Sequence, residues 1–224
     1  YSVDLATGER TLLIENNGFA SILVDHDLKV RLATQPTPSG GLKVLIRNGD
    51  DWEPLFDIAF EDVLTTNILG FDGDNQGIYL LDSRNRNTAA LVHMDLADQA
   101  LTIIAESDRT DVSSVLIDPR SHKPFAYALD LIRPEWHAIS IEFKDVIAKF
   151  NSQLTGGSQV LAQSLSNQFW TVYTDESDRS PVYRVFDASS GEFSDLFVTN
   201  PVLNEQPLAR MHGVVIPSRD GLDL

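Results

Sequence analysis

The chain contains no cysteine among its 224 residues. Disulfide bonds, thiolate nucleophiles and zinc sites with thiolate ligands are therefore excluded, while either redox compartment stays open. No apolar run approaches the roughly 20 residues that a membrane-spanning helix needs. A signal peptide is also missing, but Tyr1 already falls inside a strand-like pattern, so we expect the gene product to begin further upstream. The localisation is left unknown.

Positive charge is scarce. Seventeen lysines and arginines stand against thirty-three acidic residues, which gives a formal net charge of −16. Such a charge opposes contact with a nucleic-acid backbone or an anionic membrane surface, so we expect neither as a partner. The acidic residues are scattered over turn positions. Solvated loops explain them, and the alternative is an acidic pore that attracts the cationic ends of peptides.

The motif of a serine hydrolase nucleophile, G-x-S-x-G on a sharp strand-to-helix turn, does not occur. Residues 156–159, Gly-Gly-Ser-Gln, come nearest, but they lack the final glycine and we interpret them as a loop. The five histidines show no spacing typical of a triad or a zinc-binding helix; they are His26, His93, His122, His137 and His212. We therefore assign no catalytic residue to this chain.

Asp72-Gly-Asp74-Asn-Gln-Gly77 resembles the start of a calcium-binding loop. Gln76 stands at the fifth position and Ser83 at the twelfth, where a calcium loop needs a bidentate glutamate, so we interpret the stretch as a hairpin turn. No phosphate-binding glycine loop is present. We expect neither a metal nor a cofactor, and no cofactor-binding residue is assigned.

One hairpin pattern recurs along the chain. An alternating strand, an aspartate, a small-residue turn and an apolar return strand appear at residues 1–13, 91–104 and 183–197. The aspartates of the three copies, Asp4, Asp95 and Asp187, are 91 and 92 positions apart, which is twice a period of about 46. A weaker copy at residues 43–56 fills one intermediate position, with Asn48-Gly49 as its turn.

A second pattern repeats with the same period. Apolar strands end in acidic or polar turns near Asp27, Asp74, Asp118 and Ser166, and each turn is followed by another apolar strand. Four strands every 46 residues is the arrangement of a β-propeller blade. The fold class is therefore all-β: a partial β-propeller of about four four-stranded blades, preceded by a half blade, because the chain begins in mid-blade.

One unit departs from the repeat. Phe143, Val146, Ile147, Phe150 and Leu154 follow helical spacing, with Gly156 as the expected stop. The spacing predicts a short amphipathic helix that takes the place of the outer hairpin of that blade. Trp136 and His137, just before it, are expected to be a packing tryptophan and a partly exposed histidine; a substrate path is the alternative.

An incomplete propeller leaves two blade faces without a neighbour. Each face would expose several hundred Å² of apolar surface, which is at or beyond what soluble monomers usually show. We therefore expect the fragment to dimerise, to swap strands or to cover these faces with loops.

The end of the chain resembles the prolyl oligopeptidase family of serine peptidases at the junction where a propeller leads into an α/β-hydrolase domain. The residues that carry the resemblance, which extends upstream to Trp136, are Pro181, Tyr183, Asp187, Leu196, Phe197, Pro201, Leu203, Leu208, Ala209, Val214, Ile216, Ser218, Arg219, Asp220, Gly221 and Leu222. The resemblance implies propeller blades over residues 1–200, and a linker with the first strand of a truncated hydrolase domain over residues 201–224. The strand is expected at Val214–Ile216, before an Asp220-Gly221 turn.

The resemblance also implies a function. The parent protein would hydrolyse short peptides with a Ser, Asp and His triad beyond Leu224, and this propeller would gate the access of peptides to the hydrolase domain. Two alternatives remain open: a free-standing propeller that serves as a protein-interaction module, and a propeller enzyme that acts on sugars with acids from several blades.

Overall fold

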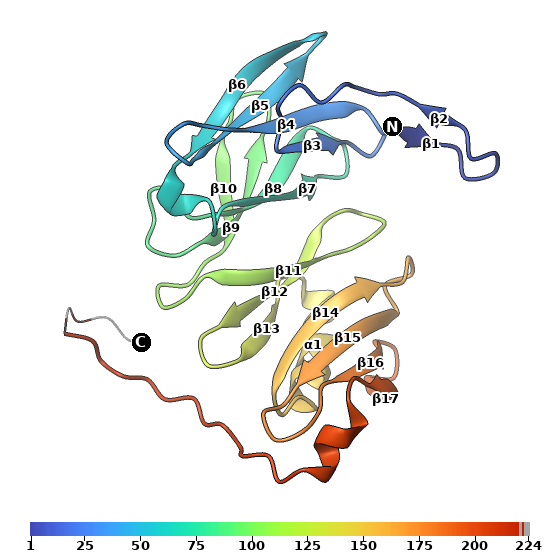
Figure 1. The fold of residues 1–224 in the computed structure, drawn as a ribbon, viewed down its shortest axis with the longest axis vertical. Coiled ribbons are helices and arrows are strands. Elements are labelled where there is room, and N and C mark those ends of the chain that lie inside the picture. Colours follow the sequence, from blue (N-terminus) through green and yellow to red (C-terminus); the bar gives the residue numbers. More distant parts are fainter. Residues whose placement is uncertain (220, 222–224) are drawn as a thin grey trace. The chain divides into compact units, whose positions relative to one another are not determined.

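The computed structural model describes residues 1–219 and residue 221 (Figure 1). The chain divides into two compact units, Tyr1–Asp111 and Val112–Leu224, and each is described by itself. Antiparallel sheets dominate both units, as the alternating sequence pattern predicts. None of the helices in the described part of the chain is long and apolar enough to cross a membrane.

Unit 1 contains a two-stranded sheet and two four-stranded sheets. Its strands are β1 (Ser2–Val3), β2 (Arg10–Thr11), β3 (Ser21–Val24), β4 (Val30–Pro36), β5 (Leu42–Asn48), β6 (Asp51–Ile58), β7 (Asn67–Phe71), β8 (Gly77–Asp82), β9 (Ala90–Asp95) and β10 (Leu101–Ala105), with a 3-10 turn η1 (Phe60–Asp62) between the two larger sheets. Strands that follow each other in the chain are neighbours in the sheet, so each sheet is a meander. The predicted half blade and the hairpins at residues 43–56 and 91–104 are confirmed.

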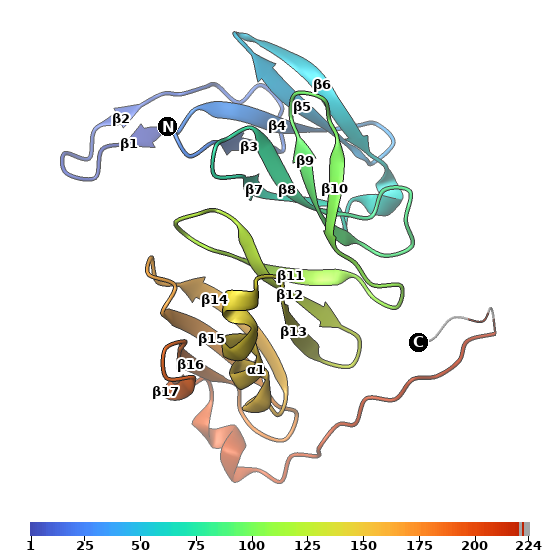
Figure 2. The same cartoon turned by 180° about the vertical axis from the view of Figure 1, so that it is seen from behind.

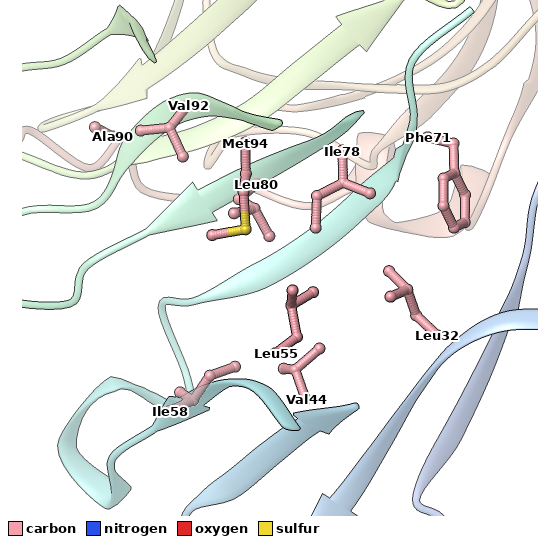
Figure 3. Packing of buried hydrophobic residues seen from close by; sticks show 10 residues of the cluster. All are labelled: Leu32, Val44, Leu55, Ile58, Phe71, Ile78, Leu80, Ala90, Val92 and Met94. Carbon is pink, nitrogen blue, oxygen red and sulfur yellow. The ribbon is translucent and has the colours of Figure 1, made fainter. Parts of the chain in front are cut away.

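The core of unit 1 lies between its two four-stranded sheets (Figure 3). Leu32 and Val44 from one sheet meet Ile78 and Leu80 from the other, and all four are fully buried. Ile78 and Leu80 are two positions apart, so both point from the same face of β8. Burial of each such side chain stabilises the folded state by about 1.5–3 kcal/mol, so the packing of these two faces stabilises both sheets.

Unit 2 contains a three-stranded sheet, one α-helix and a four-stranded sheet. Its elements are β11 (Val112–Ile117), β12 (Pro124–Asp130), β13 (Pro134–Ala138), η2 (Ile141–Phe143), α1 (Lys144–Ser152), β14 (Gly157–Gln163), β15 (Phe169–Asp175), β16 (Val182–Asp187), β17 (Glu192–Val198) and η3 (Pro201–Glu205). Helix α1 lies between β13 and the four-stranded sheet, where Figure 2 shows it in front of β14 and β15. Its buried residues Ile147 and Phe150 pack with Trp136, Trp170 and residues around them.

The predicted helix is confirmed, but two details were wrong. β13 still pairs with β12 along its whole length, so α1 replaces only the fourth strand of this blade and not its whole outer hairpin. The helix ends at Ser152, and Gly156 is not its stop. Gly156 lies against β15 instead, where a Cβ atom would come within 2.2 Å of the carbonyl oxygen of Asp175. A close approach of two backbones, and not a helix cap, explains this glycine.

The turns between the first and second strands of the four larger sheets, called here the A–B turns, share one design. They begin at Asp25, Asp72, Asp118 and Ser164, whose side chains accept hydrogen bonds from backbone N–H groups of the same turn. Each contains a residue with positive φ: Leu28, Asn75, His122 and Asn167. The period of about 46 residues in the sequence is therefore the spacing of the A–B turns. This confirms the second repeat pattern.

The C-terminal segment has no regular partner strand in the described part of the chain. After η3, residues 206–216 adopt no helix or strand, and the strand expected at Val214–Ile216 is not formed. Asp220 and Leu222, which belong to the expected turn, lie outside the described residues. The proposed boundary at residue 201 therefore stays a prediction.

Candidate functional site

The serine nearest to a hydrolase motif, Ser158, is a structural residue. It lies within β14 and is buried, so the loop predicted at residues 156–159 was wrong. A nucleophile needs its hydroxyl exposed on a strand-to-helix turn, and Ser158 has neither the turn nor the exposure.

One hydrogen-bonded pair of side chains was missed by the sequence analysis. His93 on β9 and Asp72 on the A–B turn after β7 form a hydrogen bond with 2.8 Å between Nε2 and Oδ2. Gly77 permits it, because a Cβ atom there would lie 2.2 Å from His93 Nε2 and 2.6 Å from Asp72 Oδ2. The two residues are 21 positions apart and belong to different strands, so no local pattern indicates the pair.

The surroundings of this pair shift the pKa of Asp72 and of the neighbouring Tyr79. Burial acts to raise the pKa of Asp72, but hydrogen bonds from the backbone at Gly77 and from His93 outweigh it and lower the pKa below its ordinary value. Burial raises the pKa of Tyr79, whose ring lies against His93, and the charge of Asp72 adds to this increase. No described hydroxyl hydrogen-bonds to the His93 ring, so the pair holds the turn in place and activates no nucleophile.

The stretch that resembles a calcium loop forms a hairpin turn. Asp72 and Asp74 both accept a hydrogen bond from the backbone N–H of Gln76, so their oxygens serve the turn itself. Within residues 1–219 and 221, no group of three or more His, Cys, Asp or Glu residues is arranged to hold a metal ion.

Unit 1 has a hollow of about 810 Å³ beside the loop that follows β8. Arg84 is fixed in its wall: the guanidinium donates to Asp82 at 2.8 and 2.7 Å and lies over the ring of Phe56, 4.0 Å from its centroid. Asp82 already neutralises the charge of Arg84, so this guanidinium is not available to bind an anion in the hollow. Four acidic and two basic residues line the hollow, Asp57, Glu61, Asp62, Asp82, Arg84 and Arg86.

Unit 2 has a second hollow of about 440 Å³ between β13 and α1. Tyr127 and His137 stack in its wall with 5.2 Å between ring centroids. Trp136, which also lines it, is 3% exposed and packs edge-on against Phe150. This confirms the packing role predicted for Trp136, and His137 is partly exposed as expected.

Asn151 of α1 borders the same hollow and binds the backbone of β13. Its amide oxygen accepts the N–H of Trp136 at 3.2 Å, and its amide nitrogen donates to the carbonyl of Trp136 at 2.7 Å. One side chain thus makes the two hydrogen bonds that a residue of a fourth strand would make. No local sequence pattern singles out this asparagine, because its partner Trp136 lies 15 positions away on another element.

The C-terminal segment is anchored to the loop that joins β15 and β16, the second and third strands of the four-stranded sheet of unit 2. Ser180, which is buried, donates its N–H to Asn204 Oδ1 at 2.8 Å and accepts the N–H of Asn200 at 2.9 Å. Met211 N–H donates to Ser177 Oγ at 2.8 Å. The anchored segment nevertheless exposes several large apolar side chains: Val202, Met211, Val214 and Ile216.

Two curated proteins resemble the chain along its whole length. Dipeptidyl aminopeptidase BIII of Pseudoxanthomonas mexicana is 37% identical over 226 residues, which cover 100% of this chain and 33% of that protein. Dipeptidyl peptidase family member 6 of Caenorhabditis elegans is 24% identical over 240 residues, with 100% and 32% covered. The chain therefore spans about a third of the length of these relatives. No protein-family model matches it.

Solved structures confirm the fold. Dipeptidyl peptidase 4 of Porphyromonas gingivalis matches with a TM-score of 0.62 and 13% identity, over 99% of this chain and 33% of that one. Prolyl oligopeptidase B of Galerina marginata, bound to a 35-residue substrate, matches with a TM-score of 0.53 and 11% identity, over 90% and 29%. At these identities the likeness supports the partial β-propeller predicted from the repeat, and nothing about residue roles.

Proposed function

Because the chain belongs to the prolyl oligopeptidase family of serine peptidases, we propose that it forms the later blades of a non-catalytic β-propeller. The catalytic α/β-hydrolase domain would follow Leu224 in the same parent chain. The observation that carries the proposal is the 37% identity to a dipeptidyl aminopeptidase, which runs through the whole chain yet covers only a third of that relative. By this relationship the parent protein removes dipeptides from the amino ends of peptides.

The structure supports a non-catalytic role for this part. Neither Ser158 nor the Asp72–His93 pair has the geometry of an activated hydroxyl. The anchored C-terminal segment exposes Met211 by 78% and Val214 by 68%, as expected for a linker that a following domain covers. We place the start of that linker at residue 201.

The propeller would act as a gate. A ring of blades beside a hydrolase active site lets short, flexible peptides enter and keeps large folded proteins out. The net charge of −16 agrees with this role, because a negative potential attracts the ammonium group at a peptide's amino end.

A labelling experiment tests the catalytic assignment. The parent protein and the 224-residue chain are treated in parallel with a fluorophosphonate probe, which reacts with activated serines. We expect the parent to be labelled and to release dipeptides, and the chain alone to stay unlabelled. Labelling of the chain itself, or a parent without G-x-S-x-G after Leu224, would refute the assignment and favour a free-standing interaction module.

A substrate-length series tests the gate. One cleavable amino-terminal sequence is offered to the parent as a short peptide and as the flexible end of a folded protein. We expect kcat/KM to fall steeply for the folded protein because the propeller blocks its approach. Equal values for both substrates would contradict gating while leaving the peptidase assignment intact.

A further inference from the structure

The outer edge of β13 is only partly covered, and this leaves a place for another strand. Trp136 turns its N–H and C=O away from β12, toward Asn151. Backbone groups alternate in direction along an antiparallel strand, so Ala138, two residues on, turns its N–H and C=O to the same edge. Ile139, the residue after Ala138, confirms this alternation, because its N–H bonds back to Phe125 of β12 at 2.8 Å.

The backbone groups of Ala138 on this edge have no hydrogen-bond partner among the described residues. Ala138 lines the 440 Å³ hollow, together with Lys144, Ile147, Ala148 and Asn151 of α1. These helix positions are three and four apart, so they form one face that looks onto the strand edge. A fourth strand would lie along this edge of β13. Helix α1 fills only part of that space, and the hollow is the part that remains open.

The hollow has a defined length. Lys144 and Asn151 lie seven residues apart on α1, which is about 10 Å along a helix. An extended chain covers that distance with about three residues. At the Asn151 end the strand edge is already occupied, so an added strand can pair only with Ala138 and must extend toward Lys144.

The charge of the hollow favours the carboxyl end of a peptide over its amino end. Lys144 is the sole lining residue with a permanent charge, and no acidic side chain lines the hollow. The hollow of unit 1 is lined by four acidic and two basic residues, so the two described hollows differ in the sign of their charge. A carboxylate is the group that complements an ammonium.

We propose that this hollow binds the last two or three residues of an extended peptide that has a free carboxyl terminus. One peptide residue pairs with the backbone of Ala138, as a strand added to a sheet edge does, and the terminal carboxylate binds the Lys144 ammonium. The stacked Tyr127 and His137 rings give an apolar wall for a side chain. The proposal does not depend on peptidase activity of the parent protein.

Fluorescence anisotropy tests the proposal on the 224-residue chain. The probe is fluorescein-Gly-Ala-Val-Ala with a free carboxylate, compared with the same peptide ending in an amide. We expect the acid to bind about two- to fivefold more tightly than the amide, as an exposed ion pair allows. Lys144→Gln should abolish that difference, and Lys123→Gln, which removes the same charge from an exposed site outside the hollow, should leave it unchanged.

A second variant tests the place of binding. Ala148 is exposed, so Ala148→Phe fills the hollow without entering the core and should block both peptides. In hydrogen exchange, the amide of Ala138 should become protected when the acid peptide binds. The proposal is overturned if no saturable binding occurs below about 1 mM, if acid and amide bind equally, or if a correctly folded Ala148→Phe chain binds as before.

Discussion

Asn151 binds both backbone groups of Trp136, with an amide oxygen to N–H distance of 3.2 Å and an amide nitrogen to carbonyl distance of 2.7 Å. A side chain on a helix thereby does what a fourth strand does in the other sheets. The amide is suited to this task because it carries a donor and an acceptor side by side, as a peptide group does.

Asn151→Ala should destabilise unit 2 by about 1–3 kcal/mol, since it leaves the buried backbone of Trp136 without partners. Alanine favours a helix more than asparagine does, so helix propensity alone predicts the opposite sign. Urea unfolding followed by fluorescence of Trp136 and Trp170 measures the change. Asn17→Ala, at an exposed loop position, is the control; equal stability of both variants would refute the role of Asn151.

Gly77→Ala should separate Asp72 from His93, because the added methyl group would lie 2.2 Å from Nε2 of His93. We expect a loss of about 1–3 kcal/mol in the stability of unit 1, as for overpacking at a filled site. Gly157→Ala is the matched control, since its nearest heavy atom would be 3.6 Å away, an ordinary contact. The His93 ring signals in NMR should shift only in Gly77→Ala.

The carboxylates of the A–B turns lead us to expect that the folded chain loses stability in acid. Burial tends to raise the pKa of Asp25 and of Asp118, but backbone hydrogen bonds within each turn and polar side chains prevail and lower the pKa below 3.8. A carboxyl group with a lowered folded-state pKa contributes stability that is complete above its unfolded pKa. That stability is lost as the pH falls through the lower, folded value.

The chain should therefore keep its stability down to about pH 4 and lose it progressively below. Asp118→Asn should be less stable than the parent sequence at pH 7 and should flatten the decline in acid. Thermal unfolding between pH 2 and pH 7 measures both. A decline that begins near pH 6 would assign the effect to histidines instead.

Asn167 should tolerate glycine better than alanine. Its φ is +57°, and its side chain accepts from the indole of Trp170 at 2.9 Å and donates to Asp118 at 3.3 Å. Both variants lose these bonds, but only alanine adds left-handed backbone strain of about 1–2 kcal/mol. Equal stabilities of Asn167→Gly and Asn167→Ala would show that the backbone strain is unimportant.

The repeat determined most of the fold at the level of sequence. Strand alternation and turn chemistry are local, so Asp25, Asp72 and Asp118 each mark an A–B turn and the period between them predicts the blades. The helix after β13 was predictable for the same reason, because the spacing of Val146, Ile147 and Phe150 lies within one segment. The junction residues around Pro201 were sufficient to indicate the family.

Contacts between distant segments were decided only by the tertiary structure. Asp72 meets His93 across 21 positions, and Asn151 meets Trp136 across 15, because separate elements pack side by side. The hollow at Ala138 also depends on packing. Helix α1 lies beside β13 in place of a fourth strand, and it binds the backbone of the strand edge at Trp136 but not at Ala138. Periodicity specifies which elements form, whereas side-chain volume and direction decide which of their atoms meet.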